Sequence, residues 1–465
     1  MTKKIEDVVR EIQCRAASRP GLRGRNLRRG EVSALLLAVG FAAGCGSSSA
    51  GVAGSNDSGI SDAEVTGPDV SAPSDGGVAD SPPTTDSSPP DSGVIDSSAP
   101  DSSAPDSSAP VDSGVPPTDS GSLPEAAPAD AALVPLDPAN LSKCTGTNPI
   151  ACHFGGPSGD GTPGFQANYD VTVELGGATA GDTSVQAEIS RGMLAPVATQ
   201  AGDTAIYNMV VNVRYPEGQP VADLTGAASM PTGLDMYFWP GAGGPALLKG
   251  IGYAPAVAPI VVYLATDSTG CDQFDTAFAG WGQWLPQYFD APITIANYGN
   301  SGVDTPGFAG GGSYWGAIEK VITANDYLLI ELGDNDKTDS ATSITNGLDT
   351  MITGARAKGA TPILMTPANR AIFKGDVVQP YTTGNVPTIM AQVAAAQKVT
   401  LLDLTTRTTT WIMGLGPTGY PPYFAPGEND HFDPAGASIV AGFVRDLIKA
   451  PTSGPALPGL AKYAR

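Results

Sequence analysis

The chain has 465 residues, a length that usually corresponds to two or three domains, and its formal net charge is -22. The charge is unevenly distributed, because basic residues concentrate in the first 31 positions and residues 46–130 contain no Lys or Arg. A strongly acidic chain repels phosphates, so the composition excludes nucleic acid as an expected partner.

The first 45 residues have the features of an export signal. A basic segment precedes an apolar run at residues 32–41, which is too short to span a bilayer and is followed by small residues. The sequence Ala-Ala-Gly-Cys at residues 42–45 resembles a bacterial lipobox, which implies cleavage before Cys45 and acylation of its thiol. We therefore expect an exported protein, lipid-anchored to the cell envelope (outer membrane or cell surface) and attached to the membrane only through Cys45. An ordinary signal peptide that happens to contain a cysteine is the alternative.

Residues 46–135 consist mainly of Ser, Asp, Pro, Gly and Ala, and they repeat the pattern Asp-Ser-Ser-Ala-Pro. Such a segment cannot bury enough apolar surface to offset the entropy lost on ordering. We predict a disordered linker with a root-mean-square reach on the order of 50 Å.

Residues 144–256 contain short segments that alternate apolar and polar residues, separated by turns rich in Gly, Pro and Asp. This pattern predicts a small antiparallel β-sandwich. Three consecutive aromatic residues, Tyr237, Phe238 and Trp239, are consistent with either contact to carbohydrate or packing inside the sandwich. We favour packing, because aromatic residues on a strand more often belong to a core.

Five cysteines are present. Cys14 would be removed with the signal and Cys45 would carry lipid. In an oxidising compartment Cys144 and Cys152 could form a disulfide, worth about 2–3 kcal/mol, or remain free thiols. We interpret Cys271 as an ordinary buried thiol.

From residue 258 to 450, β-strand patterns alternate with helical ones, and residues 451–465 form a C-terminal tail. The alternation predicts parallel strands, right-handed crossovers and a three-layer α/β/α domain. We expect strands at 260–265, 292–297, 327–332, 361–366 and 399–404, and helices at 278–289, 315–322, 344–358, 388–397 and 435–448.

Four polar or glycine-containing blocks follow these strands or precede the last helix. Ser268 comes after the first strand, Gly302 lies in the loop after the second, Asn335 follows the third, and His431 precedes the final helix. In open α/β sheets, active sites lie at the carboxyl ends of the strands. Together these blocks resemble the SGNH (GDSL-like) hydrolases, which have a flavodoxin-like fold.

Two further segments narrow this resemblance to the rhamnogalacturonan acetylesterase-like branch. They are Gly-Trp-Gly-Gln-Trp-Leu-Pro at residues 280–286 and Gly-Ala-Thr-Pro-Ile-Leu-Met-Thr-Pro-Ala-Asn-Arg at residues 359–370. The resemblance covers roughly residues 258–450 and implies Ser268 as the nucleophile and His431 as the general base. The scarcity of histidine supports this role, because the only other one, His153, lies ahead of the α/β region.

The third member of the catalytic set differs from the family. The family has Asp three residues before the histidine, and this chain has Glu428 at that position. Glu can orient an imidazole in the same way, so we favour Glu428 and keep Asp430 as the alternative. Thr266 also departs from the family, which has Gly there, and we expect its Cβ to crowd the turn.

Acyl transfer needs hydrogen-bond donors for the developing oxyanion. The resemblance assigns this role to the N–H groups of Ser268 and Gly302 and to the side-chain amide of Asn335. Gly302 is chosen over Gly299 by alignment with the second block of the family. The two histidines lie far apart, and no cluster of Cys or carboxylate ligands accompanies them, so we expect no metal and no cofactor.

These observations predict an exported, monomeric carbohydrate esterase that removes O-acetyl groups from an acetylated polysaccharide of the pectic type through a serine acyl-enzyme. One alternative is a surface lipoprotein that binds polysaccharide without turnover. Another is a broad-specificity esterase or lipase.

Overall fold

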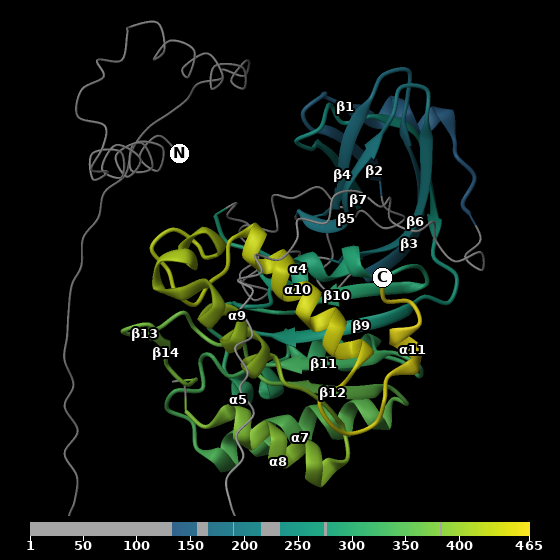
Figure 1. Cartoon of the computed structure of the whole chain (residues 1–465). Coiled ribbons are helices and arrows are strands. Elements are labelled where there is room, and N and C mark those ends of the chain that lie inside the picture. The colour runs from purple at the N-terminus through teal and green to yellow at the C-terminus, as the bar shows by residue number, and fades with distance from the viewer. Residues whose placement is uncertain (1–132, 156–165, 189, 215–232, 274–276, 382–383) are drawn as a thin grey trace, which may run out of the picture. The chain divides into compact units, whose positions relative to one another are not determined.

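The protein is described from a computed structural model (Figure 1). The described residues are 133–155, 166–188, 190–214, 233–273, 277–381 and 384–465. The predicted signal with Cys14 and Cys45, and the predicted linker up to residue 132, lie outside them. All described residues belong to one compact unit, Pro110–Arg465.

The first folded part is an antiparallel β-sandwich, as predicted. A 3-10 helix, η1 (Pro138–Lys143), precedes it. One sheet has the strand order β1-β2-β7-β4-β5 and the other has the order β6-β3-β8. The strands are β1 (Cys144–Thr145), β2 (Ile150–Gly155), β3 (Gln166–Gly176), β4 (Gly181–Ala187), β5 (Arg191–Thr199), β6 (Thr204–Arg214), β7 (Gly233–Pro240) and β8 (Leu248–Pro255).

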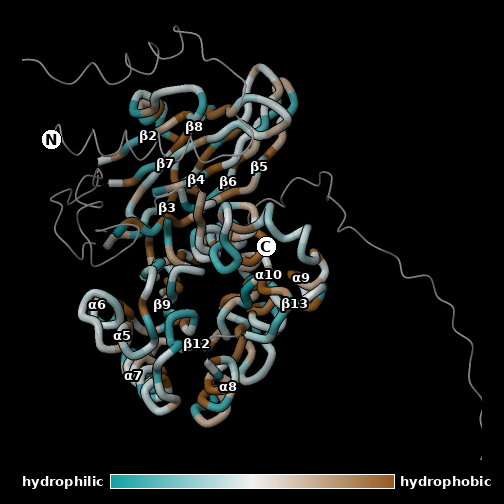
Figure 2. Tube along the Cα trace, turned by 90° about the vertical axis from the view of Figure 1, so that its left-hand side faces the viewer, coloured by the Kyte–Doolittle hydropathy of each residue, from teal (hydrophilic) through white to brown (hydrophobic). Residues whose placement is uncertain are grey.

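Alternation along the strands explains why these two sheets pack together. On β3, Val171, Val173 and Leu175 are buried in one core with residues of the other sheet, because every second side chain of a strand points to the same face. Figure 2 shows hydrophobic residues along the strands of the sandwich. The aromatic residues on β7 divide by the same rule. Phe238 is fully buried in this core, whereas Trp239 is 38% exposed.

A disulfide between Cys144 and Cys152 joins β1 to β2, so the two cysteines are not free thiols. The residues are direct partners in the antiparallel register of the two strands. Cys271 is free and buried, as expected for a thiol inside the core.

The second part is a five-stranded parallel sheet with the order β10-β9-β11-β12-β15. Its strands are β9 (Ile260–Thr266), β10 (Ile293–Asn297), β11 (Tyr327–Glu331), β12 (Thr361–Met365) and β15 (Thr400–Leu402). In chain order the arrangement is 2-1-3-4-5, the flavodoxin-like order. The first strand lies between the second and the third, so the chain reverses its direction of winding beside β9. Ligands bind at such a reversal point in open α/β sheets.

Helices cover both faces of this sheet, which confirms the three-layer prediction (Figure 1). Alternate residues of β9 belong to different cores, with Tyr263 packed on one face and Leu264 on the other. The first face is covered by α5 (Thr305–Gly310), α6 (Trp315–Val321), α7 (Ala341–Ala357) and α8 (Val386–Gln397). The second is covered by α4 (Trp281–Trp284), the 3-10 helix η2 (Leu285–Tyr288), α9 (Leu404–Gly419), α10 (Pro434–Lys449) and α11 (Pro458–Ala461).

Some elements differ from the sequence-based expectation. The helix expected at 278–289 is only α4 followed by η2, because Gly280 precedes the first turn and Pro286 interrupts the second. Helix α9 was not predicted, since its first turns are rich in Thr, a poor helix former. The Asp403 side chain caps α9, and Thr408 bonds back to the Leu404 carbonyl.

Three short elements complete the α/β part. The strands β13 (Phe373–Lys374) and β14 (Val377–Val378) form a hairpin, and η3 (Pro421–Tyr423) follows α9. Residues 451–465 pack onto the domain, with Leu457 and Leu460 buried and Arg465 bonded to Asp290. Among the described residues, none of the helices has both the length and the apolar character needed to cross a bilayer.

Candidate active site

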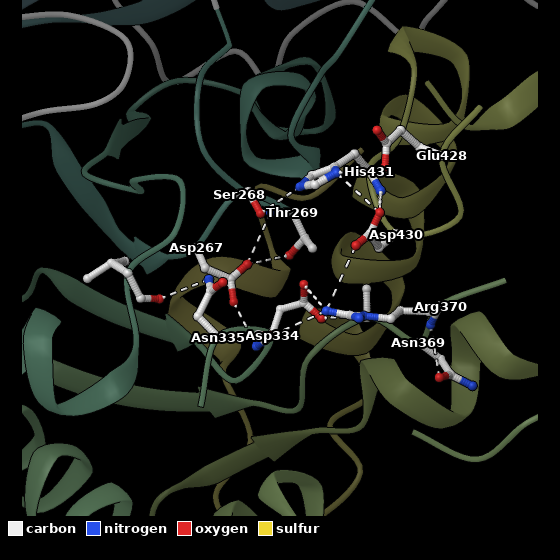
Figure 3. Close-up of polar contacts among 12 residues, drawn as sticks. Asp267, Ser268, Thr269, Asp334, Asn335, Asn369, Arg370, Glu428, Asp430 and His431 are labelled. Atoms are coloured by element: carbon white, nitrogen blue, oxygen red, sulfur yellow. Dashed lines mark hydrogen bonds and ion pairs between the residues drawn. The ribbon is translucent and has the colours of Figure 1, made fainter. Parts of the chain in front are cut away.

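Ser268 lies in the turn that follows β9, at the carboxyl end of the sheet, and it is 5% exposed. Its Oγ is 3.0 Å from Nε2 of His431, although the two residues are 163 positions apart in the chain (Figure 3). The sequence predicted both residues, and the fold places their reactive atoms within hydrogen-bonding distance.

The carboxylate of Asp267 holds this turn together. One of its oxygens accepts hydrogen bonds from the backbone N–H and hydroxyl of Thr269, at 3.1 and 3.0 Å. The other accepts from the N–H of Asp334 at 3.0 Å, which ties the turn to the loop after β11. Burial raises the pKa of Asp267 to about 7, and the charge of Asp334 adds to this rise. No role for Asp267 was predicted, although its position next to Ser268 at a strand end was a usable signal.

Thr266 does not strain the turn, contrary to our expectation. It does not have a positive φ, so a side chain is tolerated at this position. Two glycines leave room for it: a Cβ on Gly270 would be 2.8 Å from Thr266 Cβ, and one on Gly299 would be 2.2 Å from Thr266 Oγ1. The departure from the family is therefore accommodated by glycines elsewhere in the site.

His431 lies in the loop before α10, three residues ahead of Pro434. Asp433 caps that helix by accepting from the N–H of Gly436, at 2.8 Å. The carbonyl of His431 accepts from the N–H of Ala425 at 2.9 Å, and the ring of Phe278 lies edge-on to the imidazole with centroids 5.8 Å apart. Both ends of the loop are held, so the imidazole is well positioned.

Two carboxylates face Nδ1 of His431. Asp430 Oδ1 is 3.2 Å from Nδ1 and its side chain is 19% exposed, whereas Glu428 Oε2 is 3.6 Å away and its side chain is 41% exposed. The Asp430 carboxylate raises the pKa of His431, burial opposes it, and Glu428 adds a smaller rise. We predicted Glu428 as the orienting group. The geometry favours Asp430, because its carboxylate folds back to accept from the backbone N–H of His431 at 3.1 Å.

Arg370 joins Asp430 to the loop after β11. Its Nε and Nη2 donate to the two oxygens of Asp334 at 2.8 and 2.6 Å, a bidentate pair, and Nη2 is 3.9 Å from Asp430 Oδ2. Figure 3 shows this line of charged groups running from His431 to Asp334. Arg370 ends a motif that carried the family resemblance, but the sequence assigned it no role. Its place after β12, another strand end, was the available signal.

Asn335 and Gly302 lie in adjoining loops. The side-chain amide of Asn335 donates to the carbonyl of Val303 at 3.1 Å, and Gly302, the preceding residue, is exposed with φ +78°. The alternative Gly299 gives its N–H to the side chain of Asn297 at 3.0 Å. The structure therefore brings Asn335 and Gly302 to the same edge of the sheet as Ser268.

A second buried carboxyl group, Glu331 at the end of β11, lies beneath the turn and was not predicted. Its oxygens are 3.1 Å from Thr269 Oγ1, and they also accept from Trp281 Nε1 at 3.4 Å and Ala368 N at 3.1 Å. Burial, together with the charge of Asp267, raises the pKa of Glu331 well above its usual range. The single hydroxyl proton of Thr269 cannot serve two carboxylates, so a proton on Glu331 completes this set of hydrogen bonds.

Glu428, Asp430 and His431 also form, within the described residues, a group of donor atoms lying within 4.8 Å of one another. Such a group could hold a cation, but exposed acidic groups are common without one. Their carboxylates lie 3.2 and 3.6 Å from Nδ1, close enough to stabilise a protonated imidazole by charge, although within the described structure Nδ1 makes no hydrogen bond. With the proton on Nδ1, Nε2 is free to accept the proton of Ser268.

The chain is similar to known proteins in sequence and in fold. No family model matches the chain. The rhamnogalacturonan acetylesterase RhgT of Bacillus subtilis (strain 168) is 32% identical over 210 residues, which are 41% of this chain and 90% of that protein. The probable rhamnogalacturonan acetylesterase YesY of the same organism is 32% identical over 204 residues, 40% of this chain and 92% of its own length.

A solved structure of the Bacillus subtilis protein YxiM is 24% identical and has a TM-score of 0.39, covering 64% of this chain and 80% of that one. The sequence matches to RhgT and YesY extend over nearly the whole length of those relatives. The chain therefore belongs to the SGNH (GDSL-like) hydrolases, in the rhamnogalacturonan acetylesterase-like branch, and it is a serine ester hydrolase.

Proposed function

We propose that this protein hydrolyses O-acetyl esters on a pectic-type polysaccharide, with Ser268 as the nucleophile and His431 as the general base. The observation that carries the mechanism is the 3.0 Å approach of Ser268 Oγ to His431 Nε2 at the carboxyl end of β9. The pectic substrate is supported by the activity for which RhgT is named, rhamnogalacturonan acetylesterase, and by the same activity named as probable for YesY.

In the first step, Nε2 of His431 takes the proton from Ser268 as Oγ attacks the acetyl carbonyl carbon. The imidazolium that forms is stabilised by the Asp430 carboxylate, 3.2 Å from Nδ1. His431 then returns the proton to the departing sugar oxygen, which leaves an acetyl group on Ser268. Water, deprotonated by the same nitrogen, hydrolyses this acyl-enzyme and releases acetate.

Negative charge develops on the carbonyl oxygen in each tetrahedral intermediate. We assign its stabilisation to the N–H groups of Ser268 and Gly302 and to the amide of Asn335. A carboxamide has two N–H donors, and only one is needed for the bond from Asn335 to the Val303 carbonyl. Removal of one such donor costs about 3–4 kcal/mol of transition-state stabilisation in comparable enzymes.

We further infer export and lipid attachment at Cys45, with the folded part acting as a monomer. The predicted signal supports this inference, and so does the disulfide between Cys144 and Cys152, since disulfides persist in oxidising compartments. Mass spectrometry of the mature N-terminus and light scattering of the purified protein would test these statements. A mature chain beginning elsewhere than at Cys45 would contradict the anchor.

The function is tested by acetate release from acetylated rhamnogalacturonan and from acetylated xylan, with Ser268→Ala as the matched control. We expect release from the pectic substrate that is lost in Ser268→Ala. Preference for xylan would keep the mechanism and change the substrate. No release from either substrate by the folded protein, and no labelling of Ser268 by a fluorophosphonate, would favour a non-catalytic polysaccharide-binding role.

A further inference from the structure

An arginine of the sandwich reaches the loop that carries Ser268. Arg191 is the first residue of β5, and its Nε donates to Oδ2 of Asp272 at 2.8 Å. The side chains of Arg191 and Asp272 are 2% and 0% exposed, so this ion pair is buried. Nη1 of Arg191 also donates to the carbonyl of Asn212 on β6, at 2.6 Å, which holds the guanidinium from the sandwich side. Asp272 lies four residues after Ser268 in the same loop.

Asp272 also bonds to a second loop, the one after β10 that leads to Gly302. Its other oxygen, Oδ1, accepts from Nδ2 of Asn297 at 2.8 Å, and the same nitrogen donates to the carbonyl of Gly270 at 2.9 Å. Oδ1 of Asn297 accepts from the N–H of Gly299 at 3.0 Å. The loop that carries Ser268 and the loop that leads to Gly302 are therefore connected to Arg191 through one buried chain of hydrogen bonds.

A second arginine of the sandwich contacts the same region. The guanidinium carbon of Arg214, the last residue of β6, lies 4.7 Å from the ring centroid of Tyr298, a cation–π distance. Arg214 and Tyr298 are 4% and 6% exposed. Tyr298 stands between Asn297 and Gly299, so Arg214 contacts the same segment to which Arg191 is connected through Asp272 and Asn297.

The backbone of β5 also lies directly against the α/β part. A Cβ added to Gly192 would be 2.5 Å from the ring of Trp284, the last residue of α4. This close approach fixes the position of Arg191, the neighbouring residue, relative to the catalytic loops. The sandwich is thus packed against the α/β part through its backbone as well as through long side chains.

We propose that the sandwich is a structural part of the active site, in which Arg191 and Arg214 are positioning residues for the loops that carry Ser268 and Gly302. They act through Asp272, Asn297 and Tyr298 and need not touch the substrate. Buried ion pairs are weak contributors to net stability, so their use at this interface is better explained by the geometry they impose. This inference rests on the proposed function, because it concerns the reactivity of Ser268.

If the sandwich instead bound carbohydrate, its variants would affect different substrates. A small ester and the polysaccharide therefore distinguish a positioning role from a binding role. Misplacement of a nucleophile slows every ester, including 4-nitrophenyl acetate, which has no sugar. Loss of a sugar-binding surface slows only the polysaccharide and raises its KM. Comparison of the two substrates therefore tells positioning from binding.

The experiment uses the full chain with Arg191→Met, Arg191→Lys and Arg214→Met. We expect Arg191→Met to lower kcat about 10- to 100-fold on both substrates with little change in KM, since a misplacement of about 1 Å can cost 100-fold. Arg191→Lys keeps the charge and should recover part of the loss. The matched control is Lys249→Met, which breaks the Lys249–Glu174 pair of 2.8 Å within the sandwich and should leave kcat unchanged.

Unpaired Asp272 could also destabilise the fold, so a double variant separates the two effects. In Arg191→Met with Asp272→Asn neither charge of this pair is left buried, and the Asn carbonyl can still accept from Asn297. We expect stability to return while kcat stays low. Full recovery of kcat together with stability would overturn the proposal, and so would a loss confined to the polysaccharide.

Rates of fluorophosphonate labelling of Ser268 complete the test, because labelling needs no sugar. Slower labelling of Arg191→Met than of wild type supports the inference, and equal rates overturn it. Failure of the wild type to release acetate would instead contradict the proposed substrate, so the two failures are distinguishable.

Discussion

The imidazole of His431 faces two acidic side chains, Asp430 and Glu428, which differ in their hydrogen bonds and in their exposure to solvent. Asp430 is bonded to the backbone N–H of His431, and its other oxygen lies 3.9 Å from Arg370. Arg370 is in turn fixed by its bidentate pair with Asp334. Glu428 is 41% exposed, and solvent weakens the interaction of such a group with its neighbours. At the scale of single residues, Asp430 is therefore the better orienting group.

Substitution of the two carboxylates by their amides tests this assignment. We expect Asp430→Asn to lower kcat/KM by about 100-fold or more, because an amide cannot stabilise the imidazolium, and Glu428→Gln to cost less than about 5-fold. The pH at which kcat/KM reaches half its maximum should fall in Asp430→Asn, since Asp430 is the main cause that raises the pKa of His431. Hydrolysis of 4-nitrophenyl acetate across pH measures both effects. A larger loss in Glu428→Gln would contradict the assignment.

The buried carboxyl of Glu331 links the turn at Ser268 to the stability of the protein. In the folded state, burial together with the charge of Asp267 raises the pKa of this group well above the usual 4.5. The unfolded chain releases the proton above that ordinary value. A group of this kind stabilises the fold less as pH rises, since the unfolded state then binds fewer protons than the folded state.

Glu331→Gln removes this dependence, because the amide does not titrate and can occupy the same site. We expect the free energy of unfolding of the variant, minus that of wild type, to increase between pH 5 and pH 8. The increase should be about 1.4 kcal/mol for each pH unit over which only the unfolded state is ionised. Urea unfolding at both pH values measures it, with Glu319→Gln on the exposed surface of α6 as a control. A constant difference between pH 5 and pH 8 would show that Glu331 is ionised in the folded state.

At the scale of elements, the end of β9 shows how a side chain unusual for the family fits into a tight turn. Thr266 occupies space that Gly270 and Gly299 leave open, with hypothetical Cβ distances of 2.8 and 2.2 Å to its atoms. The loops after β9 and β10 can approach each other this closely only where one partner lacks a side chain. The order of the strands, with β9 between β10 and β11, brings these loops together.

Gly299→Ala should therefore be destabilising, by about 1–3 kcal/mol, as expected for overpacking of a filled site. Thr266→Ala combined with Gly299→Ala should recover part of the loss, because it removes the hydroxyl that the new Cβ would meet. Urea unfolding of the single and double variants measures the coupling. Gly414→Ala in α9, where an added Cβ meets nothing within 4 Å, is the control and should be neutral or slightly stabilising. Additive effects of Thr266 and Gly299 would contradict the packing argument.

At the scale of the whole molecule, the sandwich and the α/β part share buried polar contacts. The Arg191–Asp272 pair and the Arg214–Tyr298 stack both join the two parts, and each is almost fully buried. Opening one part alone would expose these groups or leave a charge unpaired in the other part. Such an interface couples the unfolding of the two parts.

We accordingly expect residues 133–465 to unfold in a single cooperative transition. Circular dichroism of the β-structure and fluorescence of the tryptophans, most of which lie in the α/β part, should give the same midpoint in urea. Arg191→Met should separate the two midpoints by weakening the connection. Two resolved transitions in the wild type would show that the parts unfold independently.

Local patterns in the sequence determined much of the fold and the identity of the central residues. Alternation of apolar residues predicted the sandwich, and βα alternation predicted the parallel sheet, because both depend on neighbouring residues. The pair Ser268 and His431 followed from the family blocks and from the scarcity of histidine. The Thr-rich helix α9 was missed, since its stability comes from capping and burial and not from propensity.

Only the tertiary structure decided how the site is assembled. The preference for Asp430 over Glu428 depends on its bond to the backbone N–H of His431, on its lower exposure and on contacts of 3.2 against 3.6 Å with Nδ1, which no spacing predicts. The same holds for Arg370 with Asp334 and for Arg191 with Asp272, which are 36 and 81 positions apart. Sequence patterns report which face of an element is buried. Packing of distant segments sets which side chains meet, and at the active site that determines the chemistry.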